Sequence, residues 1–168
     1  MKYRVTLIAL CLAEACVPAS VASQTQASID ANQITQSEAL TLAQGAIEAC
    51  HLRGMAANVQ VADADGHLRV ALASENAALA GLTTAPQKIA SVLAFHSSTR
   101  ALQTRLANDP AFAAQYGNDV RYHFSPGGLP LYKAGKFVAV IAVGGGRNID
   151  EDCAIEALKL LPWAKTSN

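Results

Sequence analysis

The chain has 168 residues, of which 51% are hydrophobic and 15% are charged, and it has 13 basic and 13 acidic side chains. The balanced charge argues against nucleic acid and anionic membrane surfaces as partners.

The first 23 residues are predicted to be a signal peptide. Lys2 and Arg4 form a basic start, an apolar run from Val5 to Ala13 follows, and small residues allow cleavage after Ser23. The apolar run is too short for a bilayer, so no membrane span is expected. Cleavage would leave 145 residues with 11 basic and 12 acidic side chains, enough for one domain.

Residues 24–34 are predicted to be a flexible lead-in, and residues 35–163 to form the domain. The capping box "TQSE" at Thr35 starts a helix whose apolar face ends at Cys50. The stretch "NVQVADADGHLRVALAS" predicts a hairpin that turns at Asp65-Gly66. A calcium loop at "DADG" would need a longer ligand series and a downstream glutamate, which are absent.

A second helical region is expected to begin near Pro86, because proline suits the first helical position. It runs through "QKIASVLAFHSSTRALQTRLAND", where the polar "HSST" interrupts the apolar stripe. Ser and Thr compete for backbone hydrogen bonds, so a kink or a short second helix is expected there. The next stretch, "PAFAAQYGNDVRYHFSPGG", is expected to be mostly loop with one helical turn around Phe112.

Two strands and a final helix complete the prediction. Leu129 to Tyr132 and Phe137 to Val143 form a hairpin with "KAGK" as its turn. The last helix opens at "NIDE", with Asn148 or Asp150 as its cap, and ends before Pro162. The order helix, hairpin, long helix, hairpin, helix predicts an α+β fold with helices on an antiparallel sheet.

The glycine-rich stretches do not match known phosphate loops. Phe137 follows Gly135-Lys136 where a P-loop needs Ser or Thr, and Ile149 replaces the third glycine of a dinucleotide fingerprint. The three glycines at 144–146 fit a tight reversal into a helix, or an anion site at that helix. The sequence also lacks a nucleophile elbow and an H-E-x-x-H zinc motif, so it shows no catalytic set.

Among the histidines, His96 stands out because it interrupts an apolar helical stripe. A buried or interface role and a ligand role both remain open for it. The acidic cluster at residues 150–152 is explained by the dipole of the helix that it starts.

Several ordered pieces resemble the GlcG/HbpS-like family, which is also found as the C-terminal part of PduO-type proteins. They span Thr35 to Leu161 and are "VQVADADGHL", "APQKIASVLAFHSST", "GGLPLYKAGKFVAVIAVGGG" and "DEDCAIEAL". One departure is Ala73, which stands where that family usually has an arginine. The resemblance implies a PAS- or profilin-like two-layer sandwich, in which the two glycine clusters bracket a hairpin.

In such a fold the first and last helices lie antiparallel on one face of the sheet. Cys50 at the end of one and Cys153 at the start of the other would then meet as a disulfide. Disulfides persist in oxidising compartments, which agrees with a periplasmic or secreted bacterial protein.

The resemblance also implies haem, because some family members bind it and form homo-oligomers. A planar ligand is expected near "HSST", with His96 as the iron ligand and His123 as the second candidate. Thr99 is expected to face the same pocket as His96. Lys88 and Arg100 are expected to meet the propionates, and the Gly127-Gly128 pair to let the flat ring approach the backbone. The complete set of expected ligand-contacting residues is Lys88, His96, Thr99, Arg100, His123, Gly127 and Gly128.

Three functions therefore remain open: an exported haem-binding or haem-handling protein, an accessory factor or enzyme for a small organic acid or corrinoid, and a structural oligomer without a ligand. Self-association is expected in each, because the predicted helix from Thr84 to Leu106 is apolar on more than one side.

Overall fold

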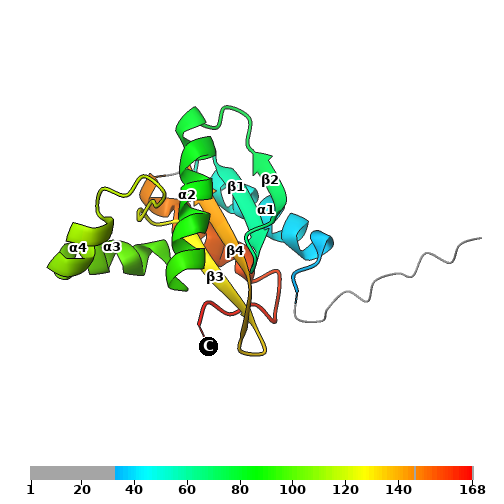
Figure 1. Ribbon diagram of the computed structural model, residues 1–168. Helices are drawn as coiled ribbons and strands as arrows, with labels where there is room; N and C mark the ends of the chain where they lie inside the picture. The colour runs from blue at the N-terminus through cyan, green and yellow to red at the C-terminus, as the bar shows by residue number, and fades with distance from the viewer. Residues whose placement is uncertain (1–32, 146, 168) are drawn as a thin grey trace, which may run out of the picture.

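The computed structural model describes residues 33–145 and 147–167; the predicted signal peptide and most of the lead-in lie outside these ranges. A four-stranded antiparallel sheet has the strand order β2-β1-β4-β3, so the predicted α+β class is confirmed (Figure 1). No helix in the described ranges is long and apolar enough to cross a membrane. The elements are α1 (Gln36–His51), β1 (Asn58–Asp63), β2 (Leu68–Ala73), α2 (Leu79–Phe95), α3 (Thr99–Asn108), α4 (Pro110–Tyr116), β3 (Gly128–Lys133), β4 (Lys136–Gly144), η1 (Arg147–Ile149) and α5 (Asp150–Leu158).

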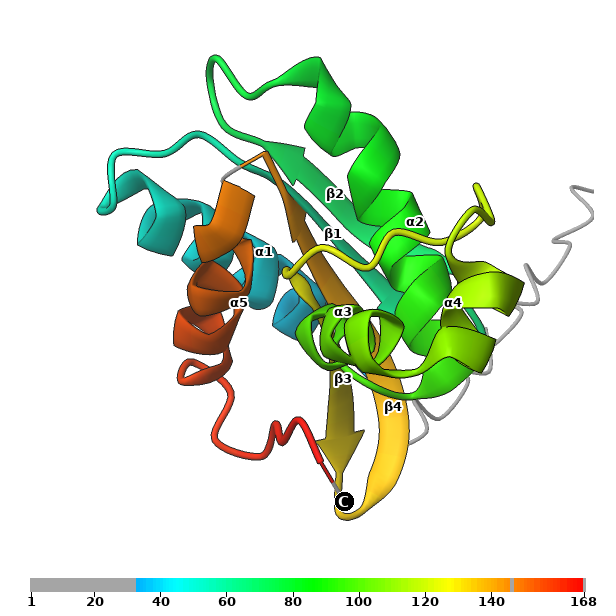
Figure 2. The same cartoon turned by 90° about the vertical axis from the view of Figure 1, so that its left-hand side faces the viewer.

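Helices cover both faces of the sheet. α1 and α5 lie on one face and α2 lies on the other (Figure 2). Successive strand residues point to opposite faces, so Val61 and Ile141 pack under α1 and α5 while Ala62 and Val140 pack under α2. The two central strands are therefore buried on both sides.

The first helix begins and ends as the sequence predicts. Thr35 accepts a hydrogen bond from the amide of Glu38 at 3.1 Å, and the Glu38 carboxylate accepts one from the amide of Thr35 at 2.8 Å. Cys50 and Cys153 form the predicted disulfide, with their Cα atoms 5.3 Å apart. This bond joins the end of α1 to the start of α5.

The second helix begins earlier than predicted. It starts at Leu79, and Pro86 lies inside it rather than at its first position. The buried side chain of Asn58 donates to the carbonyl of Ala78 at 2.9 Å and so holds the start of the helix. This contact joins residues 20 apart in sequence, and a local sequence pattern does not reveal it.

The predicted interruption at "HSST" is confirmed, and the long helix is two helices. His96 ends α2 in a left-handed conformation with φ of 49°, and Ser98 caps α3 by accepting from the amide of Ala101 at 3.2 Å. Part of the apolar surface expected to drive self-association is buried within the chain instead. It contributes to a mostly aromatic cluster of Phe95, Leu102, Leu106, Phe112, Tyr116, Tyr122 and Phe124.

The start of the last helix differs from the prediction. Neither Asn148 nor Asp150 caps it; Ile149 occupies the cap position without a side-chain hydrogen bond. Asp150 is instead the first helical residue, and its carboxylate binds the Lys88 ammonium group. Asp150 therefore forms an ion pair with a residue distant in sequence, whereas the local sequence pattern predicts that it could cap the helix.

Candidate functional site

The Lys88 ammonium group is buried against the junction of β4 and α5. Its Nζ donates to the carbonyls of Pro126 and Val143, both at 2.7 Å, and to Oδ2 of Asp150 at 2.9 Å. Burial lowers the pKa of Lys88, and Asp150 opposes that effect. An ammonium group has three N–H donors, so Lys88 has none left for the ligand propionate that the sequence analysis assigned to it.

Gly127 and Gly128 approach protein groups closely. Gly127 has φ of 130°, and a Cβ atom there would lie 2.7 Å from Nζ of Lys88. A Cβ atom on Gly128 would lie 2.8 Å from Cγ2 of Thr99. Lys88 and Thr99 therefore occupy the space into which a side chain at these positions would project.

Thr99 is fully buried at the start of α3. Its hydroxyl group accepts a hydrogen bond from the amide of Gly128 at 2.9 Å. Thr99 does not line the cavity that contains His96, although the sequence analysis expected both to face one pocket. Its hydrogen bond fixes α3 to β3.

His96 lies at a cavity of about 440 Å³ between the start of α3, strand β3, helix α5 and the C-terminal segment. Its exposed ring stacks on Phe137 with a centroid distance of 4.6 Å. The hydroxyl of Tyr132 donates to the carbonyl of His96 at 3.3 Å. The cavity is lined by His96, Ser97, Ser98, Ala101, Leu129, Tyr132, Glu151, Ile155, Thr166 and Ser167.

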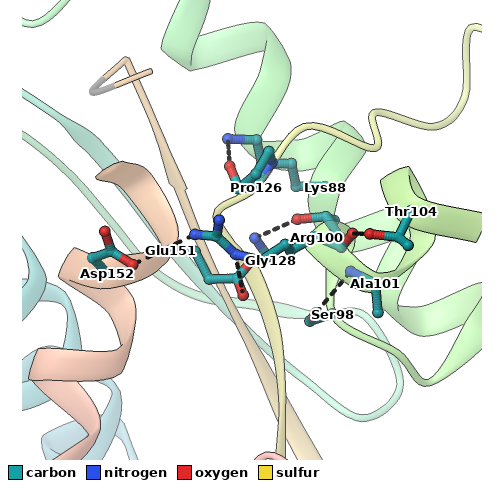
Figure 3. A network of polar contacts seen from close by, with 10 residues as sticks. Lys88, Ser98, Arg100, Ala101, Thr104, Pro126, Gly128, Glu151 and Asp152 are labelled. Atoms are coloured by element: carbon teal, nitrogen blue, oxygen red, sulfur yellow. Dashed lines mark hydrogen bonds and ion pairs between the residues drawn. The ribbon is translucent and has the colours of Figure 1, made fainter. Parts of the chain in front are cut away.

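Arg100 and Glu151 meet at the edge of this cavity (Figure 3). Nε of Arg100 donates to Oε1 of Glu151 at 3.1 Å, and its Nη2 donates to Oδ1 of Asp152 at 3.4 Å. Glu151 is 5% exposed, and its Oε2 has no hydrogen-bond partner among the described residues. Sequence reasoning missed Glu151 as a cavity residue, since the helix dipole alone accounts for an acidic first turn.

His123 lies at a second cavity, of about 320 Å³, at the other end of α2. Burial, and to a lesser degree the charge of Lys88, lowers the pKa of His123. The wall of this cavity shares no residue with that of the His96 cavity, so the two candidate iron ligands line separate cavities. It is lined by Ala78, Ala80, Gly81, Thr84, Lys88, His123, Ser125, Gly145, Asn148 and Asp150.

Asp63, Asp65 and His67 form another polar group, in the β1–β2 turn. Their possible ligand atoms lie within 4.8 Å of one another. Asp63 already accepts from the amides of Asp65 and His67 and pairs with Arg69 at 2.8 Å. These contacts support the plain turn predicted from the sequence.

Solved structures share this fold. The crystal structure of HbpS is 27% identical in sequence, with a TM-score of 0.68. The match covers 84% of this chain and 99% of the HbpS chain. An HbpS double mutant from Streptomyces reticuli is 28% identical, with a TM-score of 0.67, over 89% of this chain and 99% of its own. The PduOC:haem complex is 20% identical, with a TM-score of 0.73, over 81% of this chain and 99% of its own.

Sequence comparison gives a family assignment. No curated protein matches the chain. The profile of the family described as "Haem degrading protein HbpS-like" matches residues 34–159, which covers α1 to α5 and both cavities apart from the C-terminal segment. The chain therefore belongs to the HbpS-like family.

Proposed function

We propose that this protein is exported and binds or handles haem, with His96 as the iron ligand. The observation that carries the proposal is the cavity at the α2–α3 break, where an exposed imidazole shares a wall of mostly polar residues with the apolar side chain of Ile155. Membership of a family described as haem-degrading supports it. The related fold of a PduOC:haem complex agrees with it.

The residues around the cavity fit the chemistry of haem. Imidazole is a common axial ligand of haem iron, and the exposed side chain of Ile155 offers apolar surface to a porphyrin ring. Arg100, whose side chain is 46% exposed, supplies a guanidinium group suited to a carboxylate such as a propionate. Bound haem would supply redox-active iron, and this chain's residues would hold and orient the ring.

Export rests on the predicted signal peptide, residues 1–23. The Cys50–Cys153 disulfide supports it, because disulfides persist mainly in oxidising compartments. We propose a periplasmic or secreted location.

Haem titration of the purified protein tests the proposal. The wild type should develop a Soret band that saturates, and His96→Ala should shift that band and weaken binding. His123→Ala is the matched control and should leave both unchanged, because His123 lines the other cavity. No saturable binding by the wild type would refute the proposal and favour the alternative of an accessory factor or enzyme for a small organic acid or corrinoid.

A further inference from the structure

The cavity at His96 contains a hydrogen-bond acceptor that no residue in the described part of the chain uses. Oε1 of Glu151 binds Arg100 at 3.1 Å, whereas Oε2 is buried without a hydrogen-bond donor among the described residues. Glu151 is 5% exposed and lines the cavity wall. Leaving a buried acceptor unsatisfied costs free energy, and a ligand that brings a donor removes that cost.

Haem is a poor source of such a donor. Its four pyrrole nitrogens bind iron and carry no hydrogen. An open-chain tetrapyrrole has lost the iron, so its nitrogens include N–H groups that can donate to a carboxylate oxygen. The same cavity therefore contains an imidazole suited to iron and a carboxylate suited to N–H groups.

We propose that the His96 cavity also binds an open-chain tetrapyrrole, and that Oε2 of Glu151 accepts a hydrogen bond from its N–H groups. This inference rests on the proposed haem function, because it takes the tetrapyrrole skeleton from it. His96 recognises the iron form and Glu151 recognises the iron-free form. The protein then holds both a haem and the kind of molecule that ring opening of haem produces.

Substitution of each residue separates the two contacts. In Glu151→Gln the side-chain oxygen faces the Arg100 donor, which places an NH₂ group where Oε2 stood. Two donors then face each other, so affinity for biliverdin should fall about tenfold or more, as expected for a charge-assisted hydrogen bond. Affinity for haem should stay within about twofold of wild type. His96→Ala should show the reverse order, with affinity for haem reduced much more than affinity for biliverdin.

Asp152→Asn is the matched control, because Asp152 binds the same arginine from an exposed position outside the cavity. It should leave biliverdin affinity unchanged. Absorption titrations with haem and with biliverdin give all of these affinities, and circular dichroism checks that each variant is folded.

A second measurement keeps the test independent of the folding of Glu151→Gln. In the His96→Ala protein, biliverdin should bind more tightly than its zinc complex, because zinc occupies the nitrogens. Equal affinities, or biliverdin binding that Glu151→Gln does not weaken, would overturn the inference. Haem binding without biliverdin binding would overturn it and leave the proposed function standing, and binding of neither would overturn both.

Discussion

Buried charged side chains surround the first turn of α5. Lys88 and Asp150 form a buried pair at 2.9 Å, and the next residue, Glu151, lines the His96 cavity and binds Arg100. Local sequence reasoning identifies Lys88 and Arg100 as candidates but assigns both to ligand propionates. The buried location of Lys88 depends on β4 and α5, which lie more than 50 residues away in sequence.

Lys88→Met should destabilise the fold strongly. The variant removes the ammonium partner of Asp150 and leaves two carbonyls without their donor. Loss of one partner from a buried ion pair costs about 3 kcal/mol or more. Urea denaturation measures this loss. Lys159→Met is the control, because Lys159 pairs with Glu156 from an exposed position, and it should change the free energy of unfolding by less than about 0.5 kcal/mol.

His123 should make stability depend on pH. Its folded pKa lies below the ordinary value of 6.5, so the unfolded chain binds more protons just below that pH. The free energy of unfolding should therefore fall as the pH drops from about 6.5 towards about 5. His123→Gln should reduce this loss in urea denaturation at a series of pH values, whereas His51→Gln, at an exposed site at the end of α1, should not. If the free energy of unfolding depends on pH identically in wild type and His123→Gln, His123 is not the cause of the loss of stability.

The elements follow the sequence pattern where the pattern is local. The capping box at Thr35, the Asp65-Gly66 turn and the break at "HSST" all appear as predicted. The prediction fails at the starts of α2 and α5. Pro86 does not start α2, because Asn58 supports an earlier start, and Asp150 does not cap α5, because it binds Lys88.

The early start of α2 exposes two leucines that suit self-association. Leu79 is 81% exposed and Leu82 is 51% exposed, and residues three apart lie on the same side of a helix. We expect the wild type to sediment as an oligomer at micromolar concentration and the Leu79→Glu, Leu82→Glu double variant to sediment as a monomer. Val120→Glu, at an exposed loop position, should leave the oligomer intact; a monomeric wild type would contradict the prediction.

At the scale of the whole molecule, one sheet with helices on both faces positions two separate cavities along α2. The sequence predicts the fold class and the Cys50–Cys153 bond, because hydrophobic periodicity and family resemblance carry them. It does not predict that His96 and His123 line different cavities, or that Thr99 lies outside the His96 cavity. Those placements depend on how α3 and β3 pack together. The hydrophobic pattern of neither element predicts that packing.

The disulfide should contribute substantially to stability. It closes a loop across 103 positions of sequence, and the chain-entropy model assigns about 4 kcal/mol or more to such a loop. The Cys50→Ser, Cys153→Ser double variant should lose most of this contribution to the free energy of unfolding, as measured by urea denaturation. A reducing agent should destabilise the wild type similarly and leave the variant unchanged. A variant as stable as the wild type would contradict this role.

A crystal structure of the protein with haem bound would show whether His96 is the iron ligand. We expect the porphyrin in the cavity between α3, β3 and α5, with the iron bonded to the His96 imidazole and Arg100 beside the propionates. Iron bonded to His123, or a ring seated away from the His96 cavity, would contradict it.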